Sequence, residues 1–561
     1  MYRRYSALWL IPALLILAVA FAANPQASKS DQAPAKGAQT PAKGAQPPAA
    51  AQAPKGPRPD QFKYPPLNFK VPKPTDYRTT LSNGLVVYIA EDHEIPWFNA
   101  SIIEKTGPFL EPKEKIGLDA FTSTIMRSGG STTMTGEQIT ERMDFLGGSL
   151  GSGGGGFGGR GGRGGGFGGG GDAKSLSIHM RHLDEGLKIW MDVLSNPAFP
   201  EDKLRRDKEM AMPAIRNRNR DISTVSSRVY EQLIYGKESP ITADRTEAGI
   251  NSITRDDLVA WYKKYWGAEN TILVVSGDFK KAEMLQKLDA TFGKWRKVEK
   301  TVVPVPKVQQ DAKAGVYMVQ PEGATPNQGI IRIGHLGLKT DDPDYPAVDL
   351  MNYILGGGSF SSRITKIVRT DMGLAYTANS SFAGGAGGRF GGGGGGAGIL
   401  YPGTFTAFCQ TKNTTVVFAT QLMLDLIEGM RKGDIGEADL KMAKAARVEA
   451  FPSMFQGIGS ILQNFARLEA DGRPMDYYDG YLAKYQKLTL DDIKQAAQKW
   501  LKPDQMIVMV CGSIQECKAG ADKMQPNQPT IEAMAAKFGG RTMDDLAKKY
   551  GDGTIHVLSL K

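Results

Sequence analysis

Cysteine and histidine are scarce in this chain of 561 residues, which contains three cysteines and five histidines. So few cysteines exclude a fold held together by a framework of disulfide bonds. Cys511 and Cys517 are six positions apart and are able to pair in an oxidising compartment, which would leave Cys409 without a partner. We treat all three as small apolar residues, with the pairing of Cys511 and Cys517 left open.

A strong charge is also lacking from the folded part of the chain. The formal net charge is +10, but Arg3 and Arg4 belong to an N-terminal segment that we expect to be removed, and a Lys-rich stretch follows it. The positive and negative charges of the rest of the chain are therefore nearly balanced. This balance excludes a strongly basic nucleic-acid-binding core. Arg160 and Arg163 lie in a glycine-rich stretch similar to RNA-binding glycine-arginine segments, but two arginines are too few to predict nucleic acid as a partner.

Large apolar side chains are almost absent from residues 23–64, which are rich in Ala, Pro, Gln and Lys. Such a segment cannot bury enough surface to fold, so it is predicted to be a disordered linker.

The first 22 residues have the pattern of a signal peptide. Arg3 and Arg4 precede an apolar run over residues 7–22, which ends in the cleavage pattern Ala20-Phe21-Ala22. We therefore expect an exported chain, periplasmic or extracellular, with no stable membrane span after cleavage. An uncleaved anchor is the alternative.

Glycine is in excess, with 67 residues, and much of the excess is concentrated in two tracts. They occupy residues 151–171 and 384–398, at equivalent places in the two halves of the chain. Because glycine loses the most backbone entropy on ordering, both tracts are predicted to be flexible loops that proteases cut readily.

An internal repeat divides the chain. The stretch that begins at Ile253, ITRDDLVAWYKKYWGAENTILVVSGD, matches LTLDDIKQAAQKWLKPDQMIVMVCGS at Leu488 without a gap, at an offset of 235 residues. Each copy predicts a helix capped by threonine or aspartate, followed by a buried strand. This period is too long for solenoid units and indicates two homologous domains, residues 65–300 and 301–520.

The order of the predicted elements favours an α+β fold. Each domain is expected to have a mainly antiparallel sheet covered by helices. Residues 521–561 form a C-terminal extension with a predicted capped helix and a short strand, which is either an accessory packing element or a docking segment.

Five sequence elements follow one another along the chain: LSNGLVVYIAEDHEIP, GPFLEPKEKIGLDAF, TGEQITERMDFLGGSL, NPAFPEDKLRRDKE and, in the second half, GGGSFSSRITKIVRTDMGLAYTANS. Together they resemble the insulinase/pitrilysin zinc metallopeptidases, in their processing-peptidase-like branch. The resemblance covers roughly residues 70–515. It implies the LuxS/processing-peptidase-like metallopeptidase fold, with two domains that enclose a chamber.

The zinc motif of this family is missing. Active members carry H-x-x-E-H on the helix after a Gly-Leu pair, in which two histidines bind zinc and the glutamate activates water. After Gly117-Leu118, Ala120 and Thr124 stand at the two histidine positions and Ser123 at the glutamate position. A third ligand, expected before the pair Ile215-Arg216, is replaced by Ala214. We predict no zinc and no other cofactor in this chain.

His179 and His182 are the remaining candidates for a relocated metal site. They lie where a strand is expected to run into a helix. A separation of three along a strand would put the two rings on opposite faces, which is a poor geometry for ligands. A solvent-facing pair near a helix start, with no metal, is the other interpretation. Metal analysis would distinguish the two interpretations.

Residues of a second functional motif are present. The resemblance implies that Arg369 and Tyr376 donate hydrogen bonds to the peptide carbonyl over a zinc ion in the opposite half-site. Fixed donors there would stabilise the oxyanion of the tetrahedral intermediate. It also implies that Gly356, Gly357, Gly358 and Ser359 form a substrate-contacting loop, for which a simple helix-entry turn is the alternative.

These observations predict a non-catalytic subunit of an exported heterodimeric zinc metallopeptidase, inactive alone. Its expected partner is a family member with H-x-x-E-H that holds the zinc, and its expected substrates are unfolded or short peptides. The alternative is a structural or peptide-binding member with no peptidase partner. The partner's identity, the cleavage preference and self-association are not predictable from the sequence.

Overall fold

The computed structural model describes residues 69–151, 173–323, 325–358, 360–382, 401–519 and 542–560. The predicted signal peptide and linker, and both glycine tracts apart from Gly151, lie outside these ranges. Among the helices in them, none combines the length and the apolar character needed to cross a membrane.

The first half contains a six-stranded sheet in the order β1-β2-β6-β3-β5-β4. Four of its five neighbouring strand pairs are antiparallel, and β2 with β6 is parallel. The strands are β1 (Arg78–Thr80), β2 (Val86–Glu91), β3 (Trp97–Glu104), β4 (Ser149–Leu150), β5 (Ser175–His179) and β6 (Thr271–Gly277).

The second half repeats this arrangement in a sheet of order β12-β7-β11-β8-β10-β9. Three of its five neighbouring pairs are antiparallel, so both sheets are mixed and mainly antiparallel. The strands are β7 (Gly315–Val319), β8 (Gln328–Leu336), β9 (Ala375–Phe382), β10 (Thr404–Lys412), β11 (Ile507–Cys511) and β12 (Ile555–Leu558).

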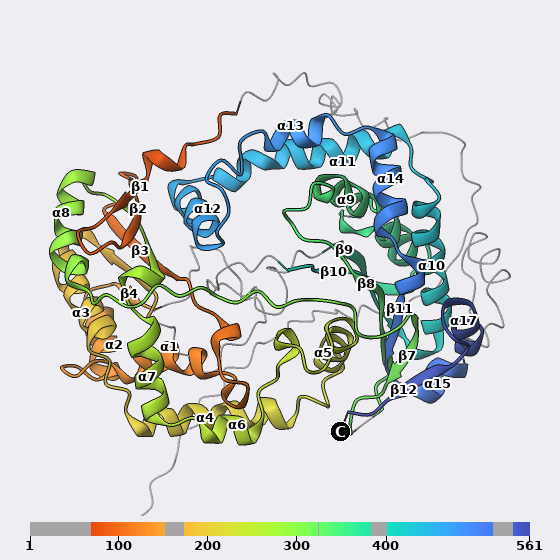
Figure 1. The fold of residues 1–561 in the computed structure, drawn as a ribbon, viewed down its shortest axis with the longest axis horizontal. Helices are drawn as coiled ribbons and strands as arrows, with labels where there is room; N and C mark the ends of the chain where they lie inside the picture. The colour runs from red at the N-terminus through yellow and green to blue at the C-terminus, as the bar shows by residue number, and fades with distance from the viewer. Residues whose placement is uncertain are drawn as a thin grey trace, which may run out of the picture. The chain divides into compact units, whose positions relative to one another are not determined.

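Helices cover both sheets, which confirms the predicted α+β fold (Figure 1). Those of the first half are α1 (Leu118–Gly129), α2 (Gly136–Phe145), α3 (Leu183–Ser195), α4 (Glu201–Arg216), α5 (Ile222–Tyr235), α6 (Glu247–Ser252), α7 (Arg255–Tyr265) and α8 (Lys281–Thr291). Those of the second half are α9 (Tyr345–Asn352), α10 (Val416–Arg431), α11 (Glu437–Ala450), α12 (Ile458–Ala470), α13 (Tyr481–Gln486), α14 (Leu490–Trp500), α15 (Ile514–Ala519) and α17 (Met543–Tyr550).

The two copies of the sequence repeat have the predicted local structure. α7 and α14 both begin with a capping box, in which the hydroxyls of Thr254 and Thr489 accept a backbone N–H from Asp257 and Asp492. A fully or almost fully buried strand follows each helix, β6 in the first copy and β11 in the second. The reciprocal bonds of the boxes satisfy backbone donors that would otherwise lack partners at a helix start.

Each half contributes one helix to the sheet of the other half, and the two helices occupy equivalent positions in the sequence. α12 of the second half packs on β2, β3 and β6 of the first sheet, whereas α5 of the first half packs on β8 and β11 of the second sheet (Figure 1). Polar bonds accompany the first contact: Glu469 on α12 accepts hydrogen bonds from Arg78 on β1 and Tyr88 on β2. The exchange buries apolar surface of both halves together.

The C-terminal segment is part of the second sheet. β12 pairs in parallel with β7 at its edge, and Met543, Leu546 and Ala547 of α17 lie in the core of this half. Residues 542–560 thus form a packing element.

Candidate functional site

Helix α1 carries the positions where the zinc motif is expected, and Glu111 holds its first turn. The Glu111 carboxylate accepts the backbone N–H groups of Gly117, at 3.1 Å, and of Asp119, at 2.8 Å. Gly117 has φ +109°, a conformation that favours glycine. Burial raises the pKa of Glu111 to about 7, against the opposing effect of the two N–H donors.

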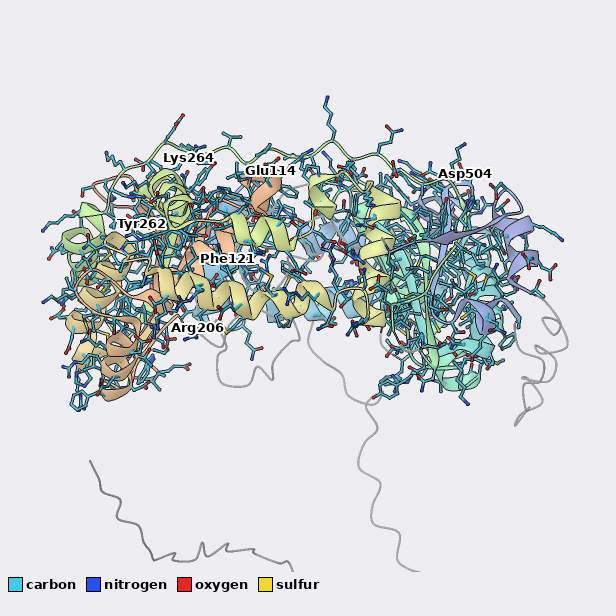
Figure 2. All side chains as sticks on the ribbon, turned by 90° about the horizontal axis from the view of Figure 1, so that it is seen from below. Glu114, Phe121, Arg206, Tyr262, Lys264 and Asp504 are labelled. Atoms are coloured by element: carbon cyan, nitrogen blue, oxygen red, sulfur yellow. The ribbon has the colours of Figure 1, made fainter. Side chains whose placement is uncertain are left out.

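The residues at the motif positions have no ligand chemistry. Ala120 is exposed and Thr124 is partly buried, whereas Ser123 is buried and its hydroxyl has no hydrogen-bond partner within the described ranges. Phe121, which lies between them in the sequence, is buried among the side chains of the first half (Figure 2). None of these side chains offers a metal the imidazole or carboxylate that zinc prefers.

The expected third ligand position lies on α4, which packs against α1. Ala214 is exposed there, and Pro213 beside it removes a backbone donor from the helix interior. Across the part of the chain that the structure describes, no group of three or more His, Cys, Asp or Glu residues is placed to hold a metal ion. The residues at this site do not fit a zinc ion.

His179 and His182 lie closer together than a continuous strand would place them. The strand β5 ends at His179 and a short 3-10 turn follows, so the ring centroids are 6.5 Å apart, with the rings edge to face. The pair lies where a strand runs into a helix, as the sequence predicted, so the opposite-face geometry of a continuous strand does not apply to it. His179 Nδ1 accepts the backbone N–H of Arg181 and is thus engaged in capping the turn.

The structure brings Arg369 and Tyr376 together. The guanidinium carbon of Arg369 lies 4.6 Å from the ring centroid of Tyr376 and 4.7 Å from that of Phe360. Both rings are unusually open, with exposed fractions of 82% for Tyr376 and 61% for Phe360. Such stacking holds an arginine in place by a cation–π attraction. It leaves the N–H groups, which lie in the plane of the guanidinium, available to a ligand.

A β-bulge accounts for the exposure of Tyr376. On β10, Gln410 pairs with Thr377 and the next residue, Thr411, pairs with Ala375, so Tyr376 is the extra residue of β9. A bulge disrupts the ladder locally and redirects the side chain of the unpaired residue. The sequence motif predicted the pair Arg369 and Tyr376, but nothing in its spacing predicted Phe360 as the third member.

The glycines of the predicted substrate loop are required by close packing. A Cβ atom on Gly356 would lie 2.5 Å from the backbone nitrogen of Ser380 on β9, and one on Gly357 would lie 2.4 Å from the Asn352 side chain. Gly358 is similarly close to the Tyr353 carbonyl. This observation favours a structural reason for the glycines, while their contact with substrate stays a prediction. Ser359 lies outside the described residues.

The three cysteines are buried and free, with no disulfide between Cys511 and Cys517. Burial raises the pKa of each thiol to about 12. They are therefore the small apolar residues that we assumed from the sequence.

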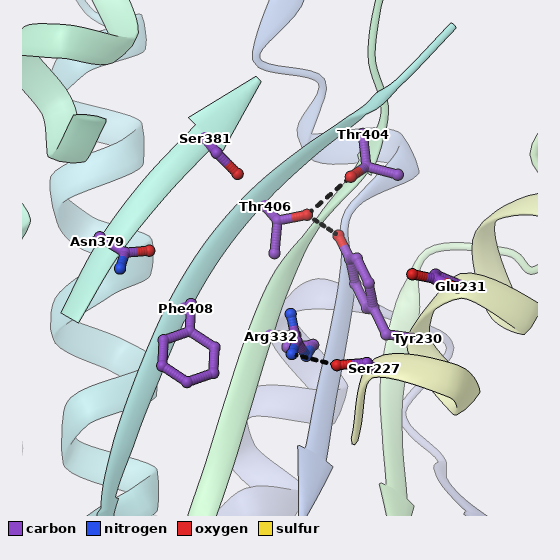
Figure 3. Close-up of a pocket in the computed structure, with 9 residues that line it drawn as sticks. All are labelled: Ser227, Tyr230, Glu231, Arg332, Asn379, Ser381, Thr404, Thr406 and Phe408. Atoms are coloured by element: carbon purple, nitrogen blue, oxygen red, sulfur yellow. Dashed lines mark hydrogen bonds between the residues drawn. The ribbon is translucent and has the colours of Figure 1, made fainter. Parts of the chain in front are cut away.

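A polar pocket where α5 of the first half covers the second sheet was not predicted. It has a volume of about 240 Å³ and lies between α5 and the strands β8, β9 and β10 (Figure 3). Its lining residues are Ser227, Tyr230, Glu231, Arg332, Asn379, Ser381, Thr404, Thr406 and Phe408. The sequence offers one signal for this pocket, the alternation of polar and apolar residues along the three strands. That alternation gives no indication that α5 covers the strands.

A family profile described as the peptidase M16 inactive domain matches residues 252–447. Over these residues the chain is similar to the peptidase M16 family. This is the insulinase/pitrilysin-type family that the motifs predicted, and the matched domain is its inactive form.

Proteins similar to this chain include some that are named as zinc proteases and one that is named as a non-peptidase homolog. It is 23% identical over 309 residues to an uncharacterized zinc protease of Rickettsia felis, which covers 54% of this chain and 68% of that protein. It is 22% identical over 315 residues to the non-peptidase homolog YmxG of Helicobacter pylori, covering 55% and 68%. The crystal structure of a peptidase M16 inactive domain from Pseudomonas fluorescens has the same fold, with a TM-score of 0.63, 21% identity and coverage of 80% of this chain and 99% of that one.

Proposed function

We propose that this chain is the non-catalytic subunit of an exported heterodimeric zinc metallopeptidase. It supplies Arg369 and Tyr376 to the active site of a partner with an H-x-x-E-H motif, which holds the zinc. The substrates are unfolded or short peptides, and the complex acts in the periplasm or outside the cell.

The exposed cluster of Arg369, Tyr376 and Phe360 is the observation that supports this proposal most. Tyr376 is exposed at the bulge of the edge strand β9, and Arg369, on the helical turn Thr365–Asp371, stacks on its ring. Both groups are donors of the kind that stabilises an oxyanion. The helices α1 and α4 carry no metal ligands at the family's positions, so a peptide bound at this cluster needs zinc from a second chain.

Export rests on the sequence alone, through the pattern of Arg3, Arg4 and the apolar run over residues 7–22. It is tested by the N-terminal residue of the mature protein recovered from the periplasm, which is expected at Ala23.

The test of the proposal is turnover by the assembled complex. Arg369→Ala and Tyr376→Phe are each expected to lower kcat for a fluorogenic peptide about 10²- to 10³-fold, the effect of losing one oxyanion donor. Phenylalanine keeps the ring that stacks on Arg369, so folding and assembly should remain intact. Assembly is measured by gel filtration on the same sample.

A matched control is Arg181→Ala, which removes an exposed arginine from the first half. It is expected to leave kcat unchanged. If each test variant forms an intact complex with normal turnover, the role of Arg369 and Tyr376 is contradicted. That result would favour a structural or peptide-binding member without a peptidase partner.

A further inference from the structure

The floor of the polar pocket is built from two rows of side chains across the second sheet. Asn379 on β9, Phe408 on β10 and Arg332 on β8 are directly paired in register. The next row on the same face is Ser381, Thr406 and Gly334. Because paired residues on neighbouring strands point to the same side, these rows form one continuous polar surface with a single aromatic ring.

Gly334 creates the space for the wall of the pocket. A Cβ atom at this position would lie 1.8 Å from the carbonyl oxygen of Phe405 and 2.4 Å from the hydroxyl of Tyr230. The absence of a side chain lets Tyr230, on α5, reach over the sheet and donate a hydrogen bond of 3.0 Å to that carbonyl. Ser227 and Glu231 lie on the same helix and complete the wall (Figure 3).

One end of the pocket is a hydrogen-bond donor. Arg332 donates from Nε to Ser226 Oγ and from Nη2 to Ser227 Oγ, both at 2.8 Å, and its guanidinium carbon is 5.1 Å from the Phe408 ring centroid. These bonds fix the guanidinium, and among the described residues Nη1 has no hydrogen-bond partner, so it is available to a ligand. Ser227 accepts from Arg332, so its own hydroxyl hydrogen is also left to donate. Burial lowers the pKa of Arg332, but arginine stays charged in proteins.

The other end is a hydrogen-bond acceptor. Tyr230 gives its only hydroxyl hydrogen to the Phe405 carbonyl and accepts a bond of 3.3 Å from Thr406. Thr406 has then used its hydrogen, so it accepts from Thr404 across 3.0 Å. This chain of hydrogen bonds leaves Thr404 Oγ1 with lone pairs only.

We propose that this pocket binds the C-terminal residue of a short peptide. The terminal carboxylate lies on Arg332 and Ser227, and the last backbone N–H donates toward Thr404. The volume is below the roughly 300–1,000 Å³ of drug-sized ligand sites, so it suits a single residue. The inference rests on the proposed function and deepens it, because it names the end of the peptide that this chain recognises.

The pocket and the Arg369 cluster share the edge strand β9. Tyr376 precedes Asn379 by three residues, and Arg332 lies two strands further in. With about 3.3 Å per residue and 4.8 Å between strands, the separation is roughly 14 Å, or about four extended residues. A peptide held in the pocket by its carboxylate would thus place a bond near Tyr376 about four residues from its end.

Binding to the isolated full chain tests this inference without a peptidase partner. Isothermal titration would use N-acetyl-trialanine with a free carboxylate, the same peptide as its C-terminal amide, and acetate. The free acid is expected to bind about 10- to 100-fold more tightly than the amide, as for loss of a hydrogen-bonded charge. Acetate, which lacks the backbone N–H, is expected to bind more weakly than the peptide acid.

Two variants locate the site. Arg332→Gln and Asn379→Asp should each weaken the free acid by about the same factor and change the amide little, whereas the exposed Arg181→Gln should change neither. Asn379 is exposed on the edge strand, so its variant answers the question even where Arg332→Gln fails to fold. Any of four results would overturn the proposal. They are equal affinity for the acid and the amide, no binding of either peptide, acetate binding as tight as that of the peptide acid, and unaltered peptide binding by Asn379→Asp. Loss of binding by the variants with normal turnover of the complex would leave the proposed function intact.

Discussion

Glu111 shows how one residue organises the helix that would carry the zinc motif. Its carboxylate satisfies two backbone donors at the start of α1, yet it lies in a largely buried position that disfavours its charge. Burial is the larger effect, so the folded chain binds a proton at Glu111 more tightly than the unfolded chain does. The group therefore stabilises the fold fully below its unfolded pKa of about 4.5, and this contribution is lost as the pH rises through 7.

The first prediction at this scale concerns pH. Between pH 5 and 7.5 the free energy of unfolding of the chain is expected to fall, by up to about 3 kcal/mol for the Glu111 contribution. Glu111→Gln keeps an acceptor oxygen and cannot ionise, so its stability should depend less on pH over this range. Urea unfolding at a series of pH values measures the difference. Parallel pH profiles for the two proteins would contradict the assignment.

At the scale of helices and strands, the exchanged helices α5 and α12 explain why the halves depend on each other. Leu462 on α12 is fully buried against the first sheet, in a cluster with Tyr88 and Val274. A helix of one half thus completes the core of the other, and the two halves are expected to unfold in one transition.

Leu462→Ala tests this packing. It is expected to lower the free energy of unfolding by about 2–5 kcal/mol, the range for leucine-to-alanine changes in a core. Ser460→Ala, at an exposed position of the same helix, is the matched control and should change stability by less than about 0.5 kcal/mol. Both are read from thermal unfolding. Two separate transitions, with only one of them shifted by Leu462→Ala, would show that the halves are independent.

The sequence was sufficient for features that depend on local pattern. The capping residues Thr254 and Thr489 predicted two helix starts, and their common offset predicted the duplication, because capping and amphipathic periods are local properties. The bulge at Tyr376 and the pocket around Arg332 were not predictable. Each depends on which strands pair and on α5, whose residues lie more than 90 positions before the strands they cover.

At the scale of the whole molecule, the duplicated halves have diverged in opposite ways. The first half keeps the sheet and helices of a zinc-binding domain without its ligands, with Ala120, Ser123, Thr124 and Ala214 at the family's positions. The second half presents the exposed cluster around Arg369, and its sheet forms the floor of the polar pocket. This division of features is the basis of our proposal that the chain binds peptide and relies on another chain for the metal.

The most direct test of this account is the metal content and the peptidase activity of the isolated full chain, measured on one preparation. After incubation with zinc and removal of the excess, the account predicts far less than one zinc ion per chain. It also predicts no chelator-sensitive cleavage of an unstructured, fluorescently labelled peptide. One tightly bound zinc per chain together with chelator-sensitive cleavage would contradict it.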